Sequence, residues 1–201
     1  MFLKLSKYVK ELYLKSFRYK RTDINGEIDK SCCSKYLMRL VFITISLIIL
    51  FVVPKGYSND FIEHISGILS ILVGLFITTL IFSFEKFYTK KKISNRFNER
   101  LKDTQDYNFT KIFTNLTSYT ILLSILAIIL VSLYTLFKEY FSLDISEVEF
   151  SLKDYDIKLT LRVFIVSLVR IITFYSLLNI LYNTVFVVVT MNHYMNNKLD
   201  E

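Results

Sequence analysis

The chain has 201 residues, of which 53% are hydrophobic, and a formal net charge of +7. A soluble protein of this length could hardly hide so much apolar side chain, because a folded chain needs a large polar surface. The apolar residues also lie in four long runs with few charges, the pattern of segments that cross a bilayer. The composition therefore predicts an all-α integral membrane protein, built as a four-helix transmembrane bundle.

We predict that residues 1–35 form a basic cytoplasmic segment that contains an amphipathic helix. Apolar side chains recur at helical spacing between Phe2 and Phe17, and lysines fill much of the remaining surface. Such a helix is suited to lie on an anionic inner leaflet. It could also pack against another cytoplasmic segment, and the sequence leaves both interpretations open.

Four spans follow this segment. The prediction is a transmembrane domain over residues 36–191, with spans at about 37–54, 63–85, 112–137 and 160–191, and a tail over 192–201. Pro54 ends the first span, which is the shortest. The second contains twenty uncharged residues from Ile65 to Phe84, enough to cross about 30 Å of hydrocarbon. The fourth, if helical from Leu159 to Met191, is about 50 Å long and must tilt or protrude.

Positive charge sets the predicted orientation. Residues 1–37 contain nine Lys or Arg and residues 85–111 contain eight, whereas residues 54–64 contain only Lys55. Residues 138–158 contain three lysines against six acidic side chains. Since positive charge favours the cytoplasmic side, both termini and the middle segment are predicted inside. The abundance of Lys, Ile, Asn, Tyr and Phe fits an AT-rich coding sequence, so we expect a bacterial inner membrane.

Two connections between the spans have patterns of their own. In the middle cytoplasmic segment, Ile93, Phe97 and Leu101 lie at helical spacing and predict a short amphipathic helix. That helix either binds a partner or packs beneath the bundle. In the second outside connection, apolar and polar residues alternate from Phe141 to Leu159, which predicts a small β-hairpin. The hairpin would be either an ordered connector or a recognition surface.

Basic residues on the predicted cytoplasmic side form a candidate surface for lipid or for a partner protein. Juxtamembrane charge accounts for them without nucleic acid, so direct nucleic-acid binding is not expected. The candidate residues are Lys4, Lys7, Lys10, Lys15, Lys90, Lys91, Lys92, Arg96 and Arg100.

Charged groups at membrane depth are costly and usually face protein, water or a partner. The candidate intramembrane charge site consists of Glu63, His64, Arg162 and Arg170, all on the predicted outer side. A structural ion pair of Glu63 with Arg170 or Arg162 is the favoured hypothesis. A ligand-binding, ion-binding or voltage-responsive site is the alternative.

Uncharged polar residues mark two further faces. Small residues on the second span predict a helix-packing face, made of Ser66, Gly67, Ser70, Gly74 and Thr78. Polar residues on the fourth span predict hydrogen bonds between helices or, alternatively, a water-filled path; they are Ser176, Asn179, Asn183 and Thr190.

The sequence contains no recognisable catalytic motif. Cys32 and Cys33 are adjacent on the predicted cytoplasmic side, where thiols normally stay reduced, and His64 and His193 are far apart. A CxxC pair, an HExxH helix and a P-loop are all missing. We therefore expect no enzyme activity, no cofactor and no metal site.

The arrangement of a basic N-terminal segment, four spans between Leu40 and Met191, a basic middle loop and short outside connections resembles a known family. It is similar to KwaA, the membrane component of Kiwa bacterial antiphage systems. The resemblance covers the chain as an arrangement and includes no diagnostic motif, so no functional residue is carried over. It implies an inner-membrane sensor or scaffold that forms homo-oligomers and acts through a cytoplasmic DNA-binding effector.

A second class of function also fits the sequence. Identical four-helix subunits could assemble around a symmetry axis into a pore or ion channel that depolarises the membrane. The sensor hypothesis predicts stable assembly with a cytoplasmic partner and little toxicity. The pore hypothesis predicts that expression permeabilises cells.

Overall fold

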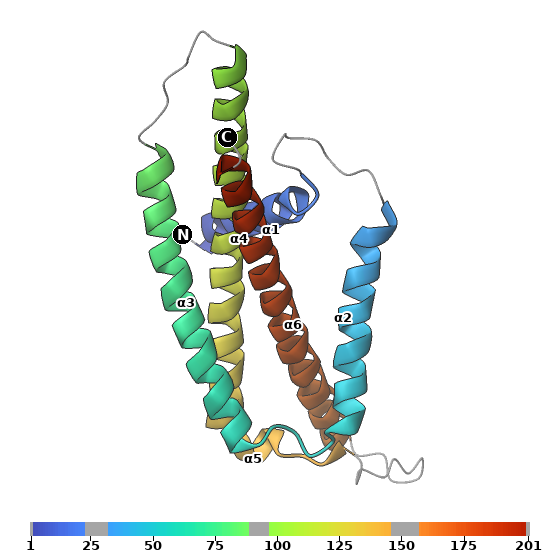
Figure 1. Cartoon of the computed structure of the whole chain (residues 1–201). Coiled ribbons are helices and arrows are strands. Elements are labelled where there is room, and N and C mark those ends of the chain that lie inside the picture. Colours follow the sequence, from blue (N-terminus) through green and yellow to red (C-terminus); the bar gives the residue numbers. More distant parts are fainter. Residues whose placement is uncertain (1, 23–31, 89–96, 146–156, 200–201) are drawn as a thin grey trace. The chain divides into compact units, whose positions relative to one another are not determined.

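A computed structural model of the chain describes residues 2–22, 32–88, 97–145 and 157–199. Six helices account for most of these residues, and no strand occurs among them (Figure 1). The helices are α1 (Phe2–Tyr19), α2 (Cys32–Val52), α3 (Asn59–Tyr88), α4 (Phe97–Leu136), α5 (Lys138–Phe141) and α6 (Ile157–Leu199). The all-α prediction is thus confirmed for the described part of the chain.

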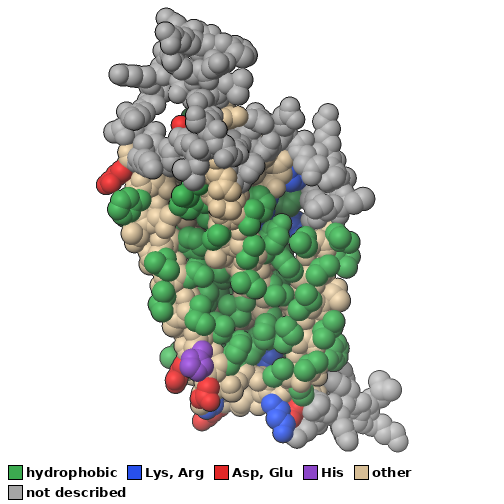
Figure 2. Space-filling view, viewed as in Figure 1, with side chains coloured by type: hydrophobic (Ala, Val, Ile, Leu, Met, Phe, Trp, Pro, Cys, Tyr) green, Lys and Arg blue, Asp and Glu red, His purple; other side chains and the backbone are tan. Residues whose placement is uncertain are grey.

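Three of the helices are long and apolar enough to cross a membrane. Their candidate spans are Asn59–Glu85, Thr104–Leu136 and Lys158–Asn192. The apolar part of α2 is the shorter stretch Leu37–Val52, about 24 Å of helix at 1.5 Å per residue. The chain therefore has the helices of a multi-pass membrane protein. Hydrophobic side chains cover much of the described surface in Figure 2, as a lipid-facing surface requires.

Two predicted connections have a different structure. Phe97 and Leu101 do not belong to a separate short helix, because they form the first turns of α4, which continues unbroken for 40 residues. Ile93 lies outside the described residues. The hairpin prediction is wrong at both of its ends: Phe141 closes the helix α5, and Ile157 begins α6. Residues 146–156 lie outside the described part.

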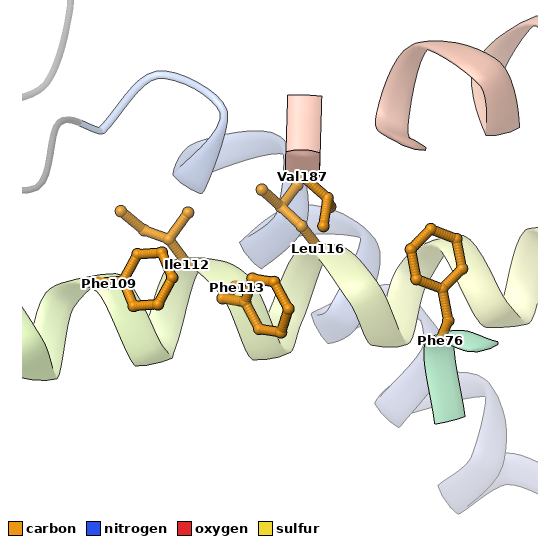
Figure 3. Packing of buried hydrophobic residues seen from close by; sticks show 6 residues of the cluster. All are labelled: Phe76, Phe109, Ile112, Phe113, Leu116 and Val187. Atoms are coloured by element: carbon orange, nitrogen blue, oxygen red, sulfur yellow. The ribbon is translucent and has the colours of Figure 1, made fainter. Parts of the chain in front are cut away.

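The helices form two compact units. The first contains α1 together with residues of α3, α4 and α6 that fall within 72–123 and 180–201. Its core is the Phe109 cluster, to which α4 contributes four side chains, α3 one and α6 one (Figure 3). The members are Phe76, Phe109, Ile112, Phe113, Leu116 and Val187.

The second unit contains α2 and α5 together with the remaining parts of α3, α4 and α6. Its core is the Tyr134 cluster, formed by Ile62, Val131, Tyr134, Phe141 and Val166, with Tyr57 and Val169 packed against it. α2 ends at Val52, and Val53 lies outside the helix because Pro54 disfavours helical backbone at the residue before it. Ser58 then caps α3, since its Oγ accepts the backbone N–H of Phe61 at 3.2 Å.

Hydroxyl and amide groups inside the apolar helices mostly bond to their own helix. Asn179 Nδ2 donates to the Tyr175 carbonyl at 2.9 Å, and Thr190 Oγ1 donates to the Phe186 carbonyl at 2.8 Å. Each bond returns to the residue one turn earlier, which satisfies the donor without a neighbouring helix. The predicted hydrogen bonds between helices are therefore not made by these two residues.

Candidate functional site

Arg170 is the residue around which the second unit is organised. It lies on α6 and is only 2% exposed. Its Nη1 donates to the Pro54 carbonyl at 2.7 Å, and its Nη2 donates to the carbonyls of Phe141 and Leu143 at 2.8 and 2.9 Å. The planar fork of a guanidinium suits such a set of acceptors, because it offers several donors in fixed directions.

The three carbonyls come from two connecting segments. Pro54 belongs to the turn between α2 and α3, whereas Phe141 and Leu143 lie at and just after the end of α5. The Pro54 carbonyl also accepts the backbone N–H of Ile145 at 3.3 Å, which joins the two segments directly. Carbonyls at helix ends have no partner within their helix. Arg170 therefore supplies donors to carbonyls that have no partner within a helix, and it fastens both segments to α6. We call this arrangement the Arg170 cluster.

Gly56 allows the chain to approach the guanidinium closely. Its φ is +90°, a conformation that residues with a Cβ rarely adopt. A Cβ built at this position would lie 2.6 Å from Arg170 Nη2 and would also overlap the Tyr134 hydroxyl. Glycine is thus required here both for its backbone conformation and for its missing side chain.

Two tyrosines complete the polar connections of the Arg170 cluster. The Tyr134 hydroxyl accepts the backbone N–H of Tyr57 at 3.2 Å and faces the Phe141 carbonyl at 3.4 Å. The Tyr57 hydroxyl donates to the backbone carbonyl of Arg170 at 2.9 Å. The ring of Tyr57 packs against the rings of Tyr134 and Phe174, with centroid separations of 5.0 and 5.2 Å. Burial raises the pKa of Tyr57, and the positive charge of Arg170 partly opposes this shift.

The charge of Arg170 is balanced by carbonyl dipoles. In the described part of the chain no carboxylate binds it, and its Nε is buried without a hydrogen-bond partner. A guanidinium stays protonated in proteins, so it cannot serve as an acid or a base. What the arrangement can do is hold the ends of helices together through a cation that is costly to expose to lipid.

The predicted ion pair with Glu63 is not formed. Glu63 and His64 are exposed on the first turns of α3, and the printed bonds of Arg162 and Arg170 all go to backbone carbonyls of other residues. Arg162 instead donates to the carbonyls of Glu139 and Tyr140, at distances between 2.7 and 3.0 Å, and lies 5.0 Å from the centre of the Tyr140 ring. Both arginines thus bind backbone oxygens. The sequence could not predict which carbonyls lie near them.

Among the described residues, no neighbouring helix approaches the two glycines of the small-residue face on α3. A Cβ at Gly67 or Gly74 would meet nothing within 4 Å. The hydroxyls of Ser70 and Thr78 bond to carbonyls of α3 itself. Only 11% of the most apolar stretch of α3 is buried, against 33% for α4 and α6. This face is available to lipid or to another molecule.

Two buried polar side chains in the first unit lack partners. Asn183 on α6 is fully buried, and neither its Nδ2 nor its Oδ1 makes a hydrogen bond. The Oγ1 of Thr117 on α4 is likewise buried and unpaired. An unpaired polar group in an apolar environment costs free energy, so these groups do not contribute to the stability of the first unit.

The basic surface is described in part. Lys4, Lys7, Lys10 and Lys15 are exposed on α1. Lys90, Lys91, Lys92 and Arg96 lie outside the described residues; Arg100 belongs to α4, but its side chain also lies outside them. Among the described residues no group of three or more His, Cys, Asp or Glu could hold a metal ion.

Sequence reasoning missed Gly56, Tyr57 and Tyr134. A signal for the first was present, because Pro54, Lys55 and Gly56 form a turn pattern directly after an apolar run. The tyrosines gave no such signal, since aromatic residues are frequent throughout this chain.

Tyr57→Phe tests the hydrogen bond to α6. We expect the variant to unfold about 1 kcal/mol more easily at neutral pH, the usual value of one such bond. The raised pKa of Tyr57 means that its stabilising contribution is complete below pH ~10, the ordinary tyrosine pKa. It is lost as the pH rises above that value. Thermal unfolding in detergent from pH 8 to 11 should therefore show the difference shrinking. Tyr8→Phe, at an exposed position, is the control.

Comparison of the chain with family models, with curated proteins and with solved structures gave no match.

Proposed function

We propose that this chain is a membrane sensor or scaffold subunit that forms homo-oligomers and acts through a cytoplasmic partner. The observation that supports it is the Arg170 cluster. It fastens two connecting segments to one continuous helix, α6. One of these segments precedes α3, and the other follows α4. In the proposed orientation these segments face the outside, and α2 is the first of four spans.

The length of α6 gives this arrangement a route for a signal. At 43 residues it is about 65 Å long, twice the thickness of the hydrocarbon core. A helix of this length must tilt or extend beyond the bilayer. An event that displaces the outer segments would act on α6 through Arg170, and α6 would carry the displacement toward the cytoplasm. The likeness of the sequence plan to the Kiwa membrane component agrees with this role.

The proposed homo-oligomer uses the small-residue face of α3. Its glycines are open within one chain, and close approach of helix backbones is what such residues allow in lipid. The cytoplasmic partner would be a DNA-binding effector that docks on basic residues of the middle segment, between α3 and α4.

A pore or ion channel is the second candidate function. The observation that favours it is the pair of unpaired buried groups, Asn183 and Thr117. In an oligomer that conducts ions, such groups would gain water or an ion as a partner.

The native mass of the protein, purified in mild detergent from cells that carry its neighbouring genes, separates these functions. We expect a homo-oligomer that retains a soluble partner, and we expect Gly67→Leu with Gly74→Leu to reduce it to smaller species. Thr44→Leu, which places a leucine at an exposed position on α2, should leave the mass unchanged. An oligomer that lacks a soluble partner and permeabilises vesicles would contradict the sensor function and support the pore function.

A further inference from the structure

The helix α1 uses its two faces differently. Its inner face packs on the first unit: Ser16 is 1% exposed, the ring of Tyr13 lies 5.8 Å from that of Tyr119, and Tyr19 contacts the Phe109 cluster. On this side Val9, Leu12 and Phe17 are partly buried and Tyr13 is 37% exposed, so protein covers the described apolar side of α1 in part. The sequence had left open whether this side meets lipid or another part of the chain, and the structure supports the second interpretation.

The outer face of α1 carries its cations. At 100° per residue, Lys4, Lys7, Lys15 and Arg18 fall within an arc of about 80°. All four are exposed, as is Lys10, which lies about 60° outside the arc. Glu11, the single acidic residue of the helix, falls inside the arc. None of these five cations forms an ion pair within the part of the chain that the structure describes, so their charge is free to attract an external anion.

Aromatic residues join α1 to two candidate membrane spans. Tyr13 meets Tyr119 of α4, and the ammonium of Lys20, just after α1, lies 4.9 Å from the centre of the Tyr182 ring on α6. Tyr119 and Tyr182 both belong to candidate membrane spans. Tyrosines gather where the hydrocarbon meets the headgroups, because their rings are apolar and their hydroxyls are wet. These contacts place α1 against two candidate membrane spans.

We propose that the outer face of α1 binds the phosphate groups of anionic phospholipids. Two exposed side chains among the cations support lipid over an acidic protein. Tyr8 is 66% exposed and Leu14 is 53% exposed, and both can enter the boundary between headgroups and acyl chains while the lysines bind phosphates. The proposal does not depend on the sensor function, because a pore would use the same face equally well.

The absence of tryptophan from the sequence makes a direct test available. A Tyr8→Trp variant of the full chain carries one fluorescent reporter on the outer face of α1. The variant is reconstituted into phosphatidylcholine vesicles that contain a small fraction of spin-labelled lipid, either phosphatidylglycerol or phosphatidylcholine. Spin labels quench tryptophan emission at short range, so the two lipids report their local concentrations beside α1.

We expect labelled phosphatidylglycerol to quench at about tenfold lower mole fraction than labelled phosphatidylcholine, and high salt to reduce this preference. Adding Lys4→Gln, Lys7→Gln and Lys15→Gln should abolish the preference. Replacing the same three lysines by arginine should retain it, which shows that charge and not a loss of folding is responsible. Equal quenching by both lipids in the parent variant overturns the proposal. The basic face would then be assigned to an acidic protein surface.

Discussion

Arg170→Leu should be among the most damaging single substitutions in this chain. It removes three hydrogen bonds to a buried cation and leaves the carbonyls of Pro54, Phe141 and Leu143 without that donor. A buried polar group that loses its partner costs about 1–3 kcal/mol. Allowing for rearrangement, we expect a loss on the order of 3 kcal/mol. The measurement is the thermal unfolding midpoint of the purified protein in mild detergent.

Arg162→Leu is the matched control for this experiment. Arg162 also lies on α6 and also donates to backbone carbonyls, but its bonds are exposed. Water can replace it there, so we expect a loss of about 1 kcal/mol or less. If the two leucine variants unfold at the same temperature, burial of the Arg170 cluster contributes nothing and its structural role is refuted.

Arg170→Lys separates charge from geometry. Lysine keeps the positive charge but donates from one nitrogen, so it cannot reproduce a fork that reaches three carbonyls in two segments. We expect stability between those of wild type and Arg170→Leu. A fully stable lysine variant would mean that the cation alone holds the segments.

The sequence was most informative where a single physical quantity decides the outcome. Length and apolarity alone identified the spans of α3, α4 and α6, because a bilayer sets the number of residues that a helix needs. The same reasoning drew attention to Arg170, since a charge inside an apolar run is rarely accidental. It also fixed the end of α2, because Pro54 cannot continue a helix.

Where several partners compete, the sequence could not decide. The partner predicted for Arg170 was Glu63, since acidic side chains are visible in a sequence. The actual acceptors are carbonyls, which every residue has, and only the fold shows which of them are orphaned. The same limit applies to Asn179 and Thr190, whose groups bond one turn back along their own helix.

The sequence also did not reveal that α4 is one continuous helix. The charges before Ile112 suggested a loop with a separate short helix, yet α4 runs from Phe97 through them. Charge determines where a helix leaves the membrane, but it does not end the helix, since Lys, Glu and Arg are good helix formers. The span boundary and the helix boundary are therefore different positions in this chain.

Gly56→Ala should be as damaging as the loss of Arg170, for a steric reason. The substitution adds one methyl group that meets Arg170 Nη2 and the Tyr134 hydroxyl, at a residue with φ of +90°. The backbone conformation alone costs alanine about 1 kcal/mol or more. The overlap then forces the guanidinium or the tyrosine from its carbonyl partners. We expect a total loss of about 3 kcal/mol in the same thermal unfolding assay.

Gly67→Ala and Gly74→Ala are the controls, because the same methyl group meets nothing within 4 Å at either position. Both lie inside α3, where alanine favours the helix over glycine by about 0.5–1 kcal/mol. These variants should be as stable as wild type or slightly more stable. Gly56→Ala combined with Tyr134→Phe removes one of the two overlapping groups, so the double variant should lose less than the two single losses added together. Full additivity would show that the added methyl group does not meet the Tyr134 hydroxyl. A Gly56→Ala variant as stable as the two controls would show that the turn presses against neither group.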